Sequence, residues 1–112
     1  MDSVLTVPKS GTIQVEGVKY HWSIYRQPRW ESTTRSLLGL AISVRSIEPS
    51  KRELILQFAI DRNRHGDMPQ HQRFRVSNPR LIECIKDALN SGWDPNSRGK
   101  RFVFDVGLVN PN

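Results

Sequence analysis

The segment LNSGWDPNSRGKRFVF, residues 89–104, contains a candidate phosphate-binding loop, because its Gly-Lys pair resembles the end of such a loop. A loop of that kind has four residues between its glycines, a Ser or Thr after the lysine, and the order strand, loop, helix. Here six residues separate Gly92 from Gly99, Arg101 follows Lys100, and an expected helix precedes the loop. A helix C-terminus also carries partial negative charge, which repels phosphate. We therefore exclude a nucleotide loop.

The same segment is typical of a turn between a helix and a strand. Gly92 stands where helices commonly end in a left-handed residue, and Trp93 follows where a side chain often packs back on the last turn. Pro95 prevents the helix from restarting. Three cations lie where they favour the helix end: Arg98, Lys100 and Arg101. The predicted turn is shaped by Gly92, Trp93, Pro95 and Gly99.

The histidines and the single cysteine are the remaining candidates for metal binding or catalysis. His65, Asp67 and His71, together with His21, could surround a metal, but their spacing matches no familiar ligand set and no cysteine pair supports them. Cys84 lies in the middle of an expected helix, away from the N-terminal dipole that activates thiols. Because the sequence also has no nucleophile elbow or glycine-rich fingerprint, we expect a structural thiol, no metal, no cofactor and no catalytic residue.

The segment 61–75, DRNRHGDMPQHQRFR, is long for a hairpin loop and rich in cations. The favoured interpretation is a solvated loop whose charge is balanced by Asp61 and Asp67. The functional interpretation is a cationic arm that holds phosphates or an acidic protein surface. Together with Arg45, the candidate binding residues are Arg62, Arg64, His65, Arg73 and Arg75.

Alternation of apolar and polar residues predicts the strands that position these side chains. Residues 18–25 alternate after an expected hairpin turn at Glu16-Gly17, and residues 28–36 break the pattern. In residues 37–47 and in residues 52–60, every second position is apolar, so these apolar side chains share one face of the strand. A turn is expected between the two strands at residues 48–51. These three strands should form an antiparallel meander, and residues 101–109 a final strand.

One helix is expected, at residues 77–92. Ser77 or Asn78 can cap it, and Pro79 suits its first turn. Its apolar residues fall within one arc of about 160 degrees: Leu81, Ile82, Cys84, Ile85, Ala88 and Leu89. The predicted fold is a single α+β domain, residues 1–112. It has an antiparallel sheet of about four or five strands with one amphipathic helix on one face, in the order strand-strand-strand-strand-helix-strand.

The sheet face opposite the helix is the candidate interaction surface, because one helix covers only one face. Small residues near its middle permit close approach by a second copy, a partner protein or stacked bases. The alternative is that residues 4–7 or 108–109 cover this face. The candidate interface residues are His21, Tyr25, Gly39, Ala41, Ser43, Ile55 and Ala59.

Composition limits the classes of function. The chain has 112 residues, 37% hydrophobic and 25% charged, which is ordinary for one globular domain. One cysteine cannot form an internal disulfide, and no segment resembles a signal peptide or a membrane span, so we expect a cytoplasmic protein without membrane contact. The net charge of +6 suits nucleic acid or another acidic partner, although acidic residues are interspersed with the basic ones.

The last third of the chain resembles a family of short, uncharacterised bacterial proteins, some of them carried in mobile gene cassettes. The shared features are a helix led by Asn78-Pro79 and closed by Gly92-Trp93-Asp94-Pro95, a loop like Arg98-Gly99-Lys100, and a terminal strand with Phe102. The resemblance implies a small bacterial cytosolic domain and carries no activity or site residue.

These features predict a non-catalytic binding module that meets a protein partner, or a copy of itself as a homodimer, through the open sheet face. The alternative prediction is a nucleic-acid-binding domain that uses the arginine-rich segment 61–75 and the same face. The salt dependence of binding distinguishes the two predictions, because phosphate contacts release counterions and contacts with an apolar face do not.

Overall fold

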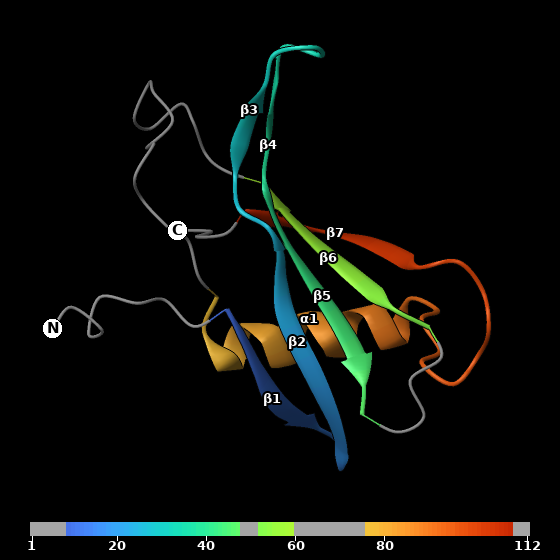
Figure 1. Cartoon of the computed structure of the whole chain (residues 1–112). Helices are drawn as coiled ribbons and strands as arrows, with labels where there is room; N and C mark the ends of the chain where they lie inside the picture. The colour runs from blue at the N-terminus through green and yellow to red at the C-terminus, as the bar shows by residue number, and fades with distance from the viewer. Residues whose placement is uncertain (1–8, 48–51, 60–75, 109–112) are drawn as a thin grey trace, which may run out of the picture.

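The computed structural model describes residues 9–47, 52–59 and 76–108. A sheet of five strands has the order β1-β2-β5-β6-β7, and the helix α1 lies behind it (Figure 1). The bounds of these elements are β1 (Ser10–Val15), β2 (Val18–Arg26), β5 (Leu40–Ser46), β6 (Leu54–Ala59), α1 (Asn78–Asn90) and β7 (Phe102–Leu108). A separate two-stranded hairpin joins β3 (Arg29–Glu31) to β4 (Ser36–Leu38).

The predicted α+β class and the predicted helix on one face are confirmed, with one difference in strand direction. β1, β2, β5 and β6 pair antiparallel in chain order, as a meander. The pair β6–β7 is parallel, with Leu54 opposite Phe102. Helix α1 lies between β6 and β7 in the chain, which is the helical crossover connection that a parallel pair requires. The sheet is therefore mixed and not wholly antiparallel.

Turn residues account for two features of the meander. Glu16 and Gly17 both have positive φ, of 51° and 84°, which is the type I′ geometry of a two-residue hairpin. Residues 28–36, expected only to interrupt the strand pattern, instead contain β3, the turn of the hairpin with Arg35 at a φ of 55°, and the first residue of β4. The strand expected at residues 37–47 is likewise divided at Gly39 into β4 and β5.

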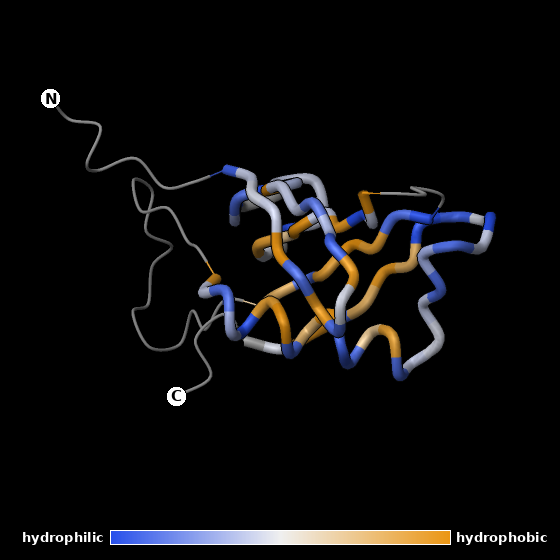
Figure 2. The backbone as a smooth tube through the Cα atoms, turned by 90° about the horizontal axis from the view of Figure 1, so that it is seen from below, coloured by the Kyte–Doolittle hydropathy of each residue, from blue (hydrophilic) through white to orange (hydrophobic). Residues whose placement is uncertain are grey.

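The core lies between α1 and one face of the sheet. Alternate residues of β5 and β6 face the helix and are fully buried or nearly so: Leu40, Ile42, Val44, Leu54, Leu56 and Phe58. The helix contributes four buried residues to this layer: Leu81, Cys84, Ile85 and Ala88. The end view in Figure 2 shows apolar stretches in both layers. The period-two and helical patterns of the sequence thus meet in a single core.

Both predicted ends of the helix are confirmed. The Ser77 side chain accepts a hydrogen bond from the Arg80 N–H at 3.3 Å and caps the N-terminus. At the other end, Gly92 has a φ of 116°, the Trp93 N–H donates to the Ala88 carbonyl at 3.0 Å, and the Gly92 N–H donates to the Leu89 carbonyl at 3.4 Å. This pair of bonds is a Schellman motif, and it supports the predicted structural turn.

The loop after the helix is fastened to Arg52, the residue two positions before β6. Trp93 is buried, lies against Tyr20 with ring centroids 5.8 Å apart, and donates from Nε1 to the Arg52 carbonyl at 3.2 Å. Arg52 in turn donates from Nε to the Lys100 carbonyl at 2.8 Å, and its guanidinium lies 5.2 Å from the centroid of the Phe102 ring. These contacts hold the start of β7 beside the start of β6.

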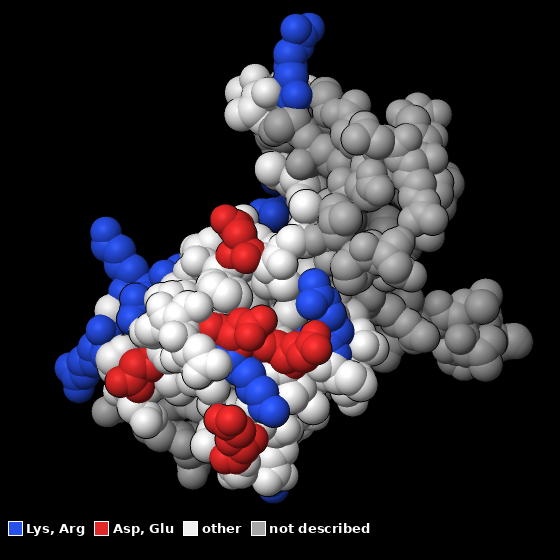
Figure 3. All heavy atoms as spheres, turned by 180° about the vertical axis from the view of Figure 1, so that it is seen from behind, with Lys and Arg blue, Asp and Glu red and all other residues white. Residues whose placement is uncertain are grey.

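The outer side of the helix carries charges of both signs. Figure 3 shows acidic and basic side chains interspersed on this side of the molecule. Glu83, Lys86 and Asp87 are exposed members of α1. In the part of the chain that the structure describes, no helix is long and apolar enough to cross a membrane.

Candidate functional site

A line of charged and polar side chains crosses four strands on the sheet face opposite the helix. His21 of β2 pairs with Arg45 of β5, and the pairing of Val44 with Leu54 places Arg45 beside Glu53. Glu53 precedes β6 and Arg101 precedes β7, so the parallel pairing of these strands makes the two residues neighbours. We call His21, Arg45, Glu53 and Arg101 the charged row.

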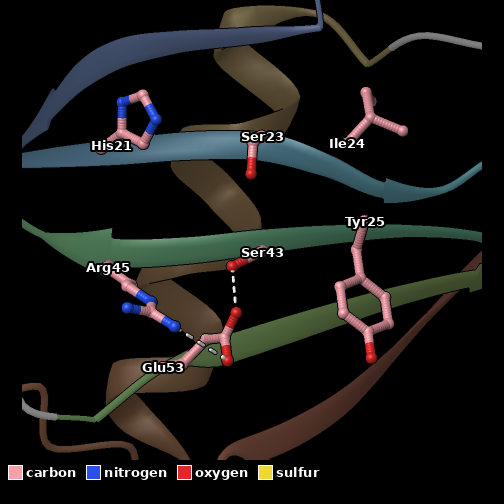
Figure 4. A pocket seen from close by; sticks show the side chains of 7 residues that line it. All are labelled: His21, Ser23, Ile24, Tyr25, Ser43, Arg45 and Glu53. Atoms are coloured by element: carbon pink, nitrogen blue, oxygen red, sulfur yellow. Dashed lines mark hydrogen bonds and ion pairs between the residues drawn. The ribbon is translucent and has the colours of Figure 1, made fainter.

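Glu53 is the centre of the charged row. Its side chain is only 13% exposed, and the Ser43 hydroxyl donates a hydrogen bond to its Oε2 (Figure 4). Arg45 Nη2 lies 3.4 Å from Oε1, and Arg101 Nε lies 3.6 Å from the same atom. Because three donors approach this carboxylate, its charge is compensated within the protein. The two arginine side chains remain 56% and 50% exposed, so their guanidinium groups are accessible from outside.

Tyr25 crosses the open face and meets the far end of the charged row. The strand pairing of β2 shifts between Ile24 and Arg26, which places Tyr25 at an irregular position of the strand. In Figure 4 its ring points from β2 across β5 toward β6. Its hydroxyl accepts a hydrogen bond from Arg101 Nη1 at 2.8 Å, and the guanidinium lies 5.5 Å from the ring centroid. The side chain is nevertheless half exposed.

These side chains surround a pocket of about 380 Å³ on the open face (Figure 4). Its lining residues are His21, Ser23, Ile24, Tyr25, Ser43, Arg45 and Glu53. The lining combines an aromatic ring, two hydroxyl groups besides that of the tyrosine, a guanidinium and a compensated carboxylate. Such a surface can hold a ligand by hydrogen bonds, by charge and by contact with a ring.

Four of the predicted site residues meet in this pocket: His21, Tyr25, Ser43 and Arg45. Ala41 and Ile55 are buried on the same side of the sheet, and Ala59 is exposed at the end of β6. Gly39 has a different reason for its size from the one we expected. A Cβ at this position would overlap the carbonyl oxygen of Phe58, so the close approach is made by strand β6 of the same chain.

Several sequence predictions fall on residues outside the described ranges. These are the cationic arm (Arg62, Arg64, His65, Arg73 and Arg75) and the residues considered for a metal (His65, Asp67 and His71). Cover of the open face by residues 4–7 or 108–109 also falls largely outside them. Within residues 9–47, 52–59 and 76–108, no group of three or more His, Cys, Asp or Glu side chains could hold a metal ion.

Sequence reasoning missed Glu53, Arg101 and Ser23 as members of the site. Arg101 was expected to favour the helix end, and instead it contacts Glu53 and Tyr25. A signal for Glu53 was present, because Arg45 and Glu53 flank one hairpin turn and both belong to the polar positions of their strands. Arg101 had no such signal, since its position depends on where β7 joins the sheet.

Cys84 is buried in the core and takes no part in the open face. Burial raises the pKa of its thiol to about 11, and nearby Asp87 and Glu83 add to the increase while Arg80 opposes it. A thiol with this pKa carries almost no thiolate at neutral pH. The predicted buried position is confirmed.

Comparison with protein-family models, curated proteins and solved structures finds no match to this chain. The resemblance of residues 78–102 to short bacterial cassette proteins therefore stays a prediction. The geometry of the open face is the basis for the functional proposal that follows.

Proposed function

We propose that this chain is a small non-catalytic binding module that receives a protein partner, or a second copy of itself, on the open face of the sheet. The observation that carries the proposal is the pocket on the open face, which is lined by residues of β2 and β5 and by Glu53 before β6. Arg101, before β7, contacts the lining residues Glu53 and Tyr25, so these side chains are held in place on the side of the sheet away from the core.

The residue types at this face support protein recognition. Tyrosine and arginine are enriched at the centres of protein interfaces, because both combine a large contact area with directed hydrogen bonds. Tyr25 and Val103 are 50% and 51% exposed. The pairing of Ser43 with Ile55, and of Ile55 with Val103, places Val103 in the sheet row next to Glu53. An apolar contact is therefore available beside the charged row.

A binding role also fits the contacts of Glu53 and the burial of Cys84. Glu53 accepts one hydrogen bond and two ion pairs, which suits a fixed charge that orients arginines better than a proton acceptor for a substrate. The single cysteine is buried. We propose the cytoplasm as the compartment, since the fold needs no disulfide.

Nucleic-acid binding is the second candidate function. The net charge of +6 and the two accessible arginines of the charged row favour it. A stacking platform would require several exposed rings on the sheet face. On β7, however, the residues that alternate with Phe102 and Phe104 are Val103 and Asp105, and the two phenylalanines pack toward the core. Protein recognition therefore remains the better supported proposal.

Site-specific photocrosslinking tests the proposed face. Benzoylphenylalanine placed at Val103 should crosslink to a partner protein or to a second copy in cells that express the chain. The same group at Lys86, on the outer side of α1, should give little product. A product with twice the mass of the chain would identify self-association. Equal products from both positions, or products from Lys86 alone, would contradict the proposal.

A further inference from the structure

The two arginines of the charged row are placed to bind a second carboxylate, besides that of Glu53. Arg45 Nη2 and Arg101 Nε both approach Oε1 of Glu53, at 3.4 and 3.6 Å. The two guanidinium groups are therefore close enough for one further carboxylate to reach both from the solvent side. Each guanidinium has five N–H donors, and about half of each side chain is exposed.

The charge of the row selects for an anion. Arg45 lines the pocket and Arg101 contacts its lining residues Glu53 and Tyr25, so two guanidinium groups face one carboxylate and leave one positive charge in excess. The Glu53 carboxylate already receives Ser43, Arg45 and Arg101, so it offers little to an incoming cation. A lysine or arginine from a partner would instead meet the two guanidinium groups and be repelled.

We infer that this pocket receives an aspartate or glutamate side chain from an acidic segment of a protein partner. The inference rests on the proposed binding function and names the chemistry of its partner. A carboxylate can accept paired hydrogen bonds from a guanidinium, which are about twice as strong as bonds between neutral groups. The pocket of about 380 Å³ also leaves room for neighbouring atoms of the segment against Ile24 and the Tyr25 ring.

One further feature favours an acidic peptide over a nucleic acid. Asp105 occupies the β7 position that follows Val103 in its alternation, and it is exposed. A polyphosphate running along the sheet would pass this negative charge, whereas a single carboxylate seated between Arg45 and Arg101 would not. The net charge of +6 would steer acidic segments toward the chain without specifying where they bind.

Binding of defined probes to matched variants tests the inference. The probes are a short labelled peptide containing glutamates, the same peptide with glutamines, and labelled oligothymidylate, each followed by fluorescence anisotropy. Arg45→Gln removes one charge from the charged row, and Lys86→Gln removes one charge from the outer side of α1. We expect the glutamate peptide to bind, the glutamine peptide to bind at least about tenfold more weakly, and Arg45→Gln to weaken the glutamate peptide about tenfold. Lys86→Gln should leave its Kd within about twofold, because exposed charges away from the site contribute little.

Other outcomes would overturn the inference. Equal weakening by both variants would mean attraction to net charge alone, and tighter binding of oligothymidylate that depends on Arg45 would identify a nucleic-acid surface. Absence of binding by the glutamate peptide to the folded wild-type protein would also overturn it. The binding module itself would still stand if Val103 alone gave crosslinks, so the two proposals fail separately. A thermal unfolding midpoint for Arg45→Gln near that of the wild type excludes loss of the fold as the cause.

Discussion

The two faces of the same strands differ in what their side chains do. On β5, Leu40, Ile42 and Val44 are fully buried against α1, while Ser43 and Arg45, which alternate with them, lie on the opposite side. On that side the polar groups contact one another through Glu53, and the guanidinium groups remain open to solvent. One strand therefore supplies the core with every second residue and the proposed binding surface with the residues between them.

In this small sheet, the residues that form the core and those of the proposed binding surface lie on opposite faces. Ala41 and Ile55 are also buried on the open side, beneath the polar and charged side chains of that face. An exposed residue of the open face can thus be changed without exposing the buried residues of the core. We expect substitutions on the two faces to have separate effects, on unfolding for one face and on binding for the other.

Truncation of one core residue should lower stability more than any other change proposed here, because it leaves a cavity between the sheet and α1. Leu56 is fully buried on the helix side, so Leu56→Ala should lower the free energy of unfolding by about 2–5 kcal/mol. Ser43→Ala, on the open face of the neighbouring strand, removes one hydrogen bond to Glu53 and should cost about 1 kcal/mol. Urea unfolding of both variants measures this. If Ser43→Ala lowered the free energy of unfolding as much as Leu56→Ala does, the open face would contribute to stability as much as the core.

The pH dependence of stability tests the burial of titratable groups in the core between the sheet and α1. The pKa of Cys84 is raised by burial to about 11 from an ordinary value near 9, and burial also raises the pKa of Tyr20, with a smaller effect of Glu16. In both cases the folded state holds its proton more tightly. The Cys84 contribution is therefore fully present below about pH 9 and is lost as the pH rises toward 11, by on the order of 2 kcal/mol. Urea unfolding at pH 8 and at pH 10.5 measures the loss. Cys84→Ala should flatten the dependence, and an equally steep decrease in that variant would assign the effect to other groups.

The loop after the helix contributes residues to both faces, and changing its first glycine should affect stability about as little as Ser43→Ala. Trp93 enters the helix-side core, and Arg101 at the end of the same loop reaches the open face. Gly92 begins this loop at a φ of 116°, so Gly92→Ala should cost about 1 kcal/mol through backbone strain. Thermal unfolding checks this, with Gly17→Ala as a second turn glycine of positive φ for comparison. An unchanged midpoint for Gly92→Ala would remove the explanation of this turn.

Local sequence patterns were sufficient to predict most of the strands and the helix. Period-two alternation predicted β2, β5 and β6, and Ser77, Pro79 and Gly92 predicted the two ends of the helix, because each of these signals acts within a few residues. The β3–β4 hairpin was missed, since its strands are three residues long and too short for a period to be visible. Gly39 was assigned to the face for a partner, although the backbone of β6 explains its size.

The candidate site could be predicted only in part, because the sequence does not show which strands pair with each other. Alternation shows which residues share a face, and it placed His21, Tyr25, Ser43 and Arg45 together correctly. It does not show which strand neighbours β7, nor in which direction that strand runs. Arg101 could therefore not be placed beside Glu53 until the parallel register of β6 and β7 was known.

The contact between Tyr25 and Arg101 joins residues that are 76 positions apart in the chain. Closing so large a loop is slow, and chains with many such distant pairings fold slowly. The charged row is complete only after β7 has joined the sheet, so a half-folded chain carries the arginines without their arrangement. A ligand that needs both arginines would bind the native state alone and would stabilise it in proportion to its concentration. Recognition at this face would thereby also report that the chain has finished folding.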